Sequence, residues 1–136
     1  MSKRMLHLWI RSEQRKNEKR VGITPQDASK LIGNGIKVTV EESADRIIST
    51  EEYHKLGCKI ADQHSWPRAP KDAIILGLKE LSEDVEILEH KHIMFGHAFK
   101  GQTAGLELLQ KFKVGNGVLY DLEYLTDPEG RRLAAF

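Results

Sequence analysis

Two expected strand ends carry side chains that can move protons. Lys79 follows the apolar run AIILGL at 73–78, and His97 follows HIMFG at 92–96. A lysine at the end of a buried strand usually extends into water, but partial desolvation lowers its pKa and makes it a usable base. Histidine titrates near neutral pH, although it is more often structural. At neighbouring strand ends the two would form an acid–base pair.

Other polar groups could complete such a site. Arginine and lysine side chains can hold carboxylate groups, and arginine can do so through two parallel hydrogen bonds. Glu123 could moderate this positive charge and hold a neighbour in position. The stretch 95–102 is therefore either a polar loop tip or the wall of a site. The candidate cations and the amide that accompanies them are Arg15, Arg20, Lys100, Arg131 and Gln102.

The composition excludes several classes of protein. The chain has 136 residues, of which 40% are hydrophobic and 30% charged, with a net charge of +1. This is typical of one soluble domain and does not favour a nucleic-acid or membrane-surface protein. A single cysteine, Cys58, allows no internal disulfide and fits a reducing compartment. The apolar run 5–10 is too short for a signal peptide or membrane span, so we expect a cytoplasmic protein.

Nucleotide and metal motifs are weak or missing. GNG at 33–35 and at 115–117 does not extend to GxGxxG, and both are better interpreted as helix ends. His90 and His92 would share one face of a strand and could bind a metal. Because no acidic or thiol partner lies at a suitable spacing, we predict no metal site.

Alternating strand and helix patterns predict one α/β domain over 1–136. The polar run 12–20 is interpreted as a solvated loop, and the apolar run 73–80 as a central strand. Short links between the elements predict a mainly parallel sheet in a three-layer, Rossmann-like (flavodoxin-like) domain. Strands are expected at 5–11, 36–42, 58–62, 73–80, 90–99, 117–125 and 131–136, with helices at 25–32, 49–57 and 103–115.

This architecture predicts where a ligand binds. In open α/β sheets, ligands bind at the carboxyl ends of the strands. Lys79, His97 and Glu123 all lie toward such ends in the expected arrangement. The topology therefore favours the wall of a ligand-binding site at 95–102 over an ordinary polar loop.

Longer motifs resemble a known superfamily. NEKRVGITP at 17–25 and VTVEES at 38–43 resemble the N-terminal domain of alanine dehydrogenases and transhydrogenase alpha subunits. Three further motifs resemble NAD-dependent, lysine-forming saccharopine dehydrogenases. These motifs are SWPRAPKDAIILGLKEL, HKHIMFGHAFKGQ and LYDLEYLTDPEGRRLAAF.

The resemblance implies an oxidoreductase of lysine metabolism that cleaves saccharopine with NAD and water to lysine and 2-oxoglutarate. In the family, the residues at Lys79 and His97 are the acid–base pair. Arg20, Gln102 and Lys100 would bind substrate, and Glu123 would tune the charge around the pair. The resemblance further assigns the cofactor contact to Arg131.

The chain departs from this family at its end. It stops at Phe136, where the family continues into an NAD-binding Rossmann domain. We therefore expect a truncated or split form that lacks this domain, binds no NAD stably and is inactive alone. The expected partner is a separate Rossmann-domain chain, or a second copy of this chain that buries the exposed apolar surface in a homodimer. The alternatives are a non-catalytic module that binds amino or keto acids or acts as an interaction partner, and an alanine dehydrogenase-like domain.

Overall fold

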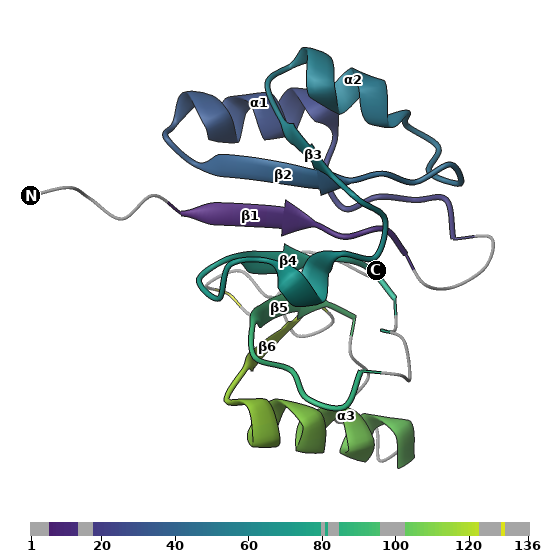
Figure 1. Cartoon of the computed structure of the whole chain (residues 1–136), viewed down its shortest axis with the longest axis vertical. Helices are drawn as coiled ribbons and strands as arrows, with labels where there is room; N and C mark the ends of the chain where they lie inside the picture. The colour runs from purple at the N-terminus through teal and green to yellow at the C-terminus, as the bar shows by residue number, and fades with distance from the viewer. Residues whose placement is uncertain are drawn as a thin grey trace, which may run out of the picture.

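A computed structural model describes residues 6–13, 18–79, 81, 85–95, 103–122 and 129 (Figure 1). Its strands are β1 (His7–Ile10), β2 (Lys37–Glu41), β3 (Lys59–Ala61), β4 (Ile74–Leu76), β5 (Lys91–Met94) and β6 (Val118–Asp121). Its helices are α1 (Pro25–Gly33), α2 (Thr50–Lys55), a single 3-10 turn η1 (Trp66–Arg68), and α3 (Thr103–Gly115).

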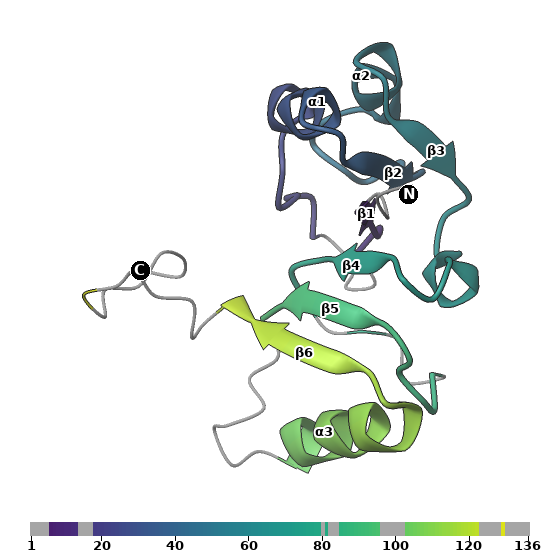
Figure 2. The ribbon, with the colours of Figure 1, turned by 90° about the vertical axis from the view of Figure 1, so that its left-hand side faces the viewer.

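The described strands form one parallel sheet in the order β3-β2-β1-β4-β5-β6. This is the strand order of a doubly wound Rossmann fold, and it confirms the predicted fold class. β1 and β4 lie side by side at the centre, where the order reverses (Figures 1 and 2). Such a reversal point is where this architecture places its ligands.

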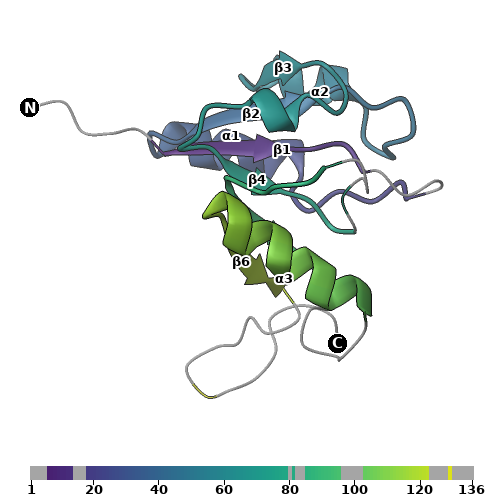
Figure 3. The ribbon, with the colours of Figure 1, turned by 60° about the horizontal axis from the view of Figure 1, so that its bottom comes forward.

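Two cores cover opposite faces of the sheet. Side chains alternate along a strand, so neighbours such as Trp9 and Ile10 point to different faces. Ile10 packs with residues of α1 and α2, whereas Trp9 packs with η1 and with Phe112 of α3. Figure 2 shows α3 beside β5 and β6, and Figures 2 and 3 show this helix away from α1 and α2. The domain therefore has the three layers that the sequence predicts.

The first helix begins as its sequence dictates. Thr24 is the N-cap, and its hydroxyl accepts a hydrogen bond from the backbone N–H of Asp27 at 3.1 Å. Pro25 occupies the first turn, where its missing N–H costs nothing. Gly35 follows the helix with a φ of +87°, a conformation that glycine adopts without strain.

The predicted strand 73–80 is too long. β4 ends at Leu76, because the backbone groups of Leu78 and Lys79 are bound by side chains that follow β1. β5 and β6 also end earlier than predicted, at Met94 and Asp121. The expected strand at 131–136 lies outside the described residues. Lys79 therefore stands three residues beyond its strand rather than within it.

His92 lies at the centre of the β5 half of the core. It is fully buried, and its ring meets Trp66 and Phe112 edge-on, with centroid distances of 5.0 and 5.4 Å. Among the described residues, neither ring nitrogen has a hydrogen-bond partner. Burial, together with the Arg11 cation and His90, lowers the pKa of His92 to about 3. The core therefore holds a histidine that must stay neutral.

This histidine should make the fold sensitive to acid. The unfolded chain protonates His92 below its ordinary pKa of 6.5, whereas the folded chain does not. Stability should therefore fall as the pH drops from the unfolded towards the folded value, by about 2 kcal/mol between about pH 7 and about pH 5. We expect the free energy of unfolding of His92→Leu, measured with urea at both pH values, to lack this pH-dependent loss. The control is His54→Gln, whose side chain is 63% exposed; an unchanged pH slope in His92→Leu would contradict this account.

Candidate functional site

Two side chains that follow β1 hold the loop that follows β4. The carboxylate of Glu13 accepts hydrogen bonds from the backbone N–H groups of Leu78 and Lys79, both at 2.9 Å. The guanidinium of Arg11 donates to the backbone carbonyl of Lys79 and lies 3.4 Å from the Glu13 carboxylate. The side chains of Arg11 and Glu13 are 1% and 7% exposed. The backbone that carries Lys79 is therefore fixed by a buried ion pair.

Gly77 makes room for this arrangement. A Cβ atom at this position would overlap the guanidinium of Arg11. The same guanidinium reaches the sulfur of Met94 in β5, at 4.0 Å. Any side chain at position 77 would therefore push Arg11 away from the Lys79 carbonyl.

A second ion pair lies at the same edge of the sheet. Arg20 donates to both oxygens of the Glu18 carboxylate, from Nε at 3.0 Å and from Nη2 at 2.7 Å. This hydrogen-bonded guanidinium lowers the pKa of Glu18, and the Lys79 cation adds a smaller effect in the same direction. Glu18 is largely buried, at 7% exposure, whereas Arg20 is 69% exposed. Arg20 thus presents a cation to solvent close to the charge of Lys79.

Arg46 brings a further cation to this region. It is 9% exposed, and its guanidinium carbon lies 5.6 Å from the ring centroid of Tyr53. Burial lowers the pKa of Arg46, and the carboxylates of Glu41 and Glu13 oppose that effect. The next residue, Ile47, donates its N–H to the carbonyl of Lys19 at 2.8 Å. The loop of Arg46 therefore packs against the segment that carries Arg20.

Glu41 fixes the residue that precedes Glu13. Its fully buried carboxylate accepts hydrogen bonds from Trp9 Nε1 at 2.7 Å and from the backbone N–H of His64 at 2.8 Å. It also accepts from the N–H and the hydroxyl of Ser12, at 3.0 and 2.9 Å. With four donors on one carboxylate, the course of the chain beyond β1 is closely defined.

The predicted site residues fall into two groups. Lys79 and Arg20 are described, and the structure places both at the carboxyl ends of the central strands. The remaining predicted residues lie outside the described part of the chain, so their placement stays a prediction. They are His97, Lys100, Gln102, Glu123, Arg131 and Arg15.

The interpretation of 12–20 as a solvated loop is wrong at its start. Ser12 is 3% exposed and the Glu13 side chain 7%, because both take part in hydrogen bonds between strands. It holds for Lys19 and Arg20, which are exposed. The missed signal is position, since Arg11 to Glu13 leave a central strand at its carboxyl end. There a charged side chain can reach the neighbouring strand.

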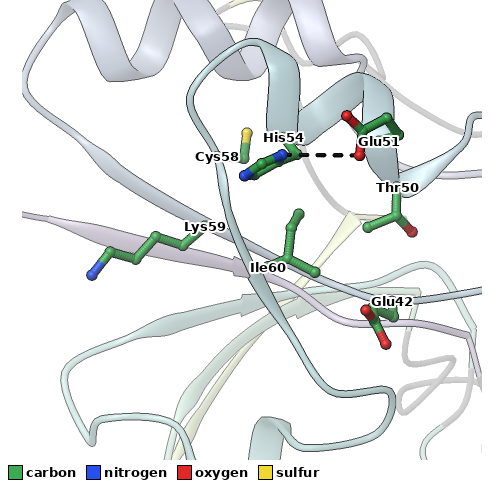
Figure 4. Close-up of a pocket in the computed structure, with 7 residues that line it drawn as sticks. All are labelled: Glu42, Thr50, Glu51, His54, Cys58, Lys59 and Ile60. Carbon is green, nitrogen blue, oxygen red and sulfur yellow. Dashed lines mark ion pairs between the residues drawn. The ribbon is translucent and has the colours of Figure 1, made fainter.

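A separate hollow lies at the outer edge of the sheet. It has a volume of about 620 Å³, and Figure 4 shows its lining from α2, from Glu42 and from the start of β3. His54 Nδ1 lies 3.9 Å from a carboxylate oxygen of Glu51 there, and burial raises the pKa of the nearby Cys58 thiol. β1 and β2 separate β3 from β4 in the sheet, so this hollow is distinct from the Lys79 region.

Neither a metal nor a membrane span is apparent in the described part of the chain. No group of three or more histidine, cysteine, aspartate or glutamate side chains is arranged there to hold a metal ion. None of the described helices is long and apolar enough to cross a membrane.

Comparison with known proteins defines the class. The family model of the alanine dehydrogenase/PNT N-terminal domain matches residues 9–136, and the chain belongs to that family. The fold is shared with a solved transhydrogenase from Sinorhizobium meliloti, at a TM-score of 0.70 and 20% identity over 88% of this chain and 36% of that one. An L-alanine dehydrogenase structure matches at a TM-score of 0.74 and 15% identity, over 92% of this chain and 34% of that one.

Within this family, the chain is similar to lysine-forming saccharopine dehydrogenases. It is 47% identical to the NAD(+)-dependent enzyme of Schizosaccharomyces pombe over 96% of this chain and 36% of that protein. The Emericella nidulans enzyme is 48% identical over 95% of this chain and 35% of the relative. These similarities confirm the predicted resemblance. The chain spans about a third of the length of these relatives.

The described residues do not fit the NAD that the relatives' names imply. A dinucleotide site of this fold type needs a glycine-rich turn that leads directly from β1 into α1. Here the link from β1 to α1 runs from Arg11 to Thr24 and contains Gly22 as its one glycine. The link from β1 to α1 therefore lacks the glycine-rich turn that would hold the cofactor's pyrophosphate.

The buried carboxylate of Glu41 provides a test of this framework. We expect Glu41→Gln to destabilise the fold by about 2–4 kcal/mol. The NH₂ group of the glutamine amide cannot accept the hydrogen bonds that the carboxylate oxygen accepted in its place. Urea unfolding measures this change. Glu42→Gln, at the adjacent and exposed position, is the matched control. Equal stability of the two variants would show that the network does not hold the strand ends.

Proposed function

We propose that this chain is the substrate-side domain of a saccharopine dehydrogenase. Together with a dinucleotide-binding domain it would convert saccharopine, NAD and water to lysine and 2-oxoglutarate. The observation that carries this proposal is the fixed backbone of Lys79 at the carboxyl end of β4, beside the Glu18–Arg20 pair. The similarity to saccharopine dehydrogenases over nearly the whole chain supports the choice of substrate.

Lys79 and His97 are proposed as the acid–base pair. Phe95 donates its N–H to the carbonyl of Leu78 at 3.0 Å, so the two strand ends stay in register beyond β4 and β5. Lys79 is the next residue after Leu78, and His97 comes two residues after Phe95. Two residues of chain span at most about 7 Å, and we propose that this short distance lets the imidazole of His97 approach the Lys79 ammonium.

Such a pair suits the hydrolysis of an imine. Water must lose a proton when it adds to the imine carbon, and the departing amine must gain one when the carbinolamine collapses. A lysine and a histidine of different pKa can divide these transfers between them. Lys79, close to the negative charge of Glu18, would serve as one member and His97 as the other.

Cations at the same edge would bind the carboxylates of saccharopine. Arg20 is exposed and already oriented by Glu18 through two hydrogen bonds. Lys100 and Gln102 would extend this set beyond β5, and Glu123 would moderate the charge beyond β6. The resemblance assigns a cofactor contact to Arg131. A substrate with three carboxylates requires several such donors.

The NAD-binding part would come from a further domain. The chain spans about a third of its relatives, at 36% of the Schizosaccharomyces pombe protein, so in those proteins most of the polypeptide lies elsewhere. On the face of β5 and β6 opposite α3, Val118 is 42% and Tyr120 51% exposed. We propose that this face receives the remaining domain. A homodimer through it is the other arrangement, and sedimentation of the chain distinguishes the two.

A non-catalytic module is the second candidate function. The same cations would then bind an amino or keto acid without turnover, and Lys79 would be vestigial. No described contact favours this version over the first. Binding of 2-oxoglutarate or lysine without NAD-linked turnover, even after addition of a dinucleotide-binding domain, would identify it.

Calorimetry with saccharopine tests the proposed function. We expect binding by the chain, and a roughly tenfold weaker affinity in Arg20→Gln because a bidentate charge-assisted contact is lost. Arg68→Gln is the matched control, since Arg68 is exposed on η1. Absence of heat with saccharopine, lysine and 2-oxoglutarate would overturn the proposal, and an equal effect of both substitutions would exclude Arg20 from the site.

A further inference from the structure

We propose that Glu13 and Arg11 are positioning residues for Lys79, a role that rests on the proposed function of Lys79. They do not touch the substrate in this account. They hold the backbone from which the reacting ammonium extends. The role comes from three described contacts to main-chain atoms of Leu78 and Lys79.

The contacts fix the loop from both sides. Towards β5, Gly77 donates to the carbonyl of Ile93 and Leu78 accepts from Phe95, each at 3.0 Å. Towards β1, Glu13 accepts from Leu78 and Lys79, and Arg11 donates to Lys79. The N–H groups of Leu78 and Lys79 and the carbonyl of Lys79 are thereby all bound by side chains that follow β1. The loop has little freedom to carry Lys79 elsewhere.

Stability alone is a poor reason for this arrangement. Burying a guanidinium and a carboxylate costs several kcal/mol per ion, and a well-packed apolar pair is often as stable. The ion pair instead fixes the orientation of the backbone, because a carboxylate accepts two parallel N–H hydrogen bonds in one plane. It requires glycine at 77, since a Cβ there would overlap Arg11. Three residues, Arg11, Glu13 and Gly77, thus serve to hold one backbone segment in position.

In the position that these contacts fix, Lys79 lies close to the other charged side chains of this region. The Lys79 cation contributes to the lowered pKa of Glu18, and the Glu13 carboxylate raises the pKa of Arg20 after the stronger effect of Glu18. A displaced Lys79 would carry its positive charge away from the Glu18–Arg20 pair. The clamp therefore determines whether the proposed base and the proposed carboxylate-binding arginine share one site.

Glu13→Gln tests the clamp with little change in shape. Its amide oxygen can accept one of the two N–H bonds, while its NH₂ group opposes the other. We expect exchange of the Leu78 and Lys79 amide protons, followed by NMR, to become roughly tenfold faster. We also expect the ¹³Cε–¹Hε signal of Lys79 to move to the position of the exposed lysines. Saccharopine affinity should fall by a similar factor.

A second variant and a control separate positioning from general damage. Gly77→Ala should displace Arg11 and give the same Lys79 signal change with Glu13 intact. Glu52→Gln removes an exposed carboxylate of α2 and should leave every readout unchanged. Urea unfolding of each variant shows whether it is folded under the conditions of the NMR measurement.

The outcomes are distinct. Unchanged amide exchange in Glu13→Gln overturns the clamp, and faster exchange with an unmoved Lys79 signal overturns the positioning role. If the unmodified chain binds no saccharopine, the proposed function fails, yet the amide and Lys79 signals of the free chain still decide whether Glu13 positions Lys79. Faster exchange, a moved signal and weaker binding together support the proposal.

Discussion

The pair of hydrogen bonds from the Leu78 and Lys79 backbone to the Glu13 carboxylate ties together the two central strands of the sheet. The backbone position of Lys79 at the carboxyl edge depends on these hydrogen bonds. Glu41 holds Ser12 from one side, so Glu13 leaves β1 in a defined direction. Arg11 adds its bond to the Lys79 carbonyl because Gly77 leaves it room. A single segment of three residues therefore joins β1, β2 and β4.

The fold was readable from the sequence because local signals and topology agree. The Thr24 cap, the predicted apolar strand at 73–80 and the short links all indicate one parallel sheet, and the structure confirms that sheet. Strand ends were harder to place. β4 stops at Leu76 because side chains distant in sequence take its next backbone groups, and no local pattern records such competition.

The position of the site could be predicted from the sequence, but the side chains that hold its residues in place were harder to predict. The strand-end rule located Lys79, and the resemblance singled out Arg20. Glu13 and Glu18 lie in a charged run that usually indicates solvent exposure, and Arg11 directly precedes that run. Their burial is a tertiary effect, since it depends on which strand lies beside β1. His97 and its neighbours remain predictions because they lie outside the described residues.

The central claim is that Lys79 and His97 lie in one substrate site and divide its proton transfers between them. A crystal structure of the chain with saccharopine tests it most directly. Our account predicts that the Lys79 ammonium and the His97 imidazole both approach the secondary amine of saccharopine, while Arg20 holds one of its carboxylates. Side chains of Lys79 and His97 on opposite faces of the sheet, or saccharopine bound away from the carboxyl ends of β1 and β4, would contradict it.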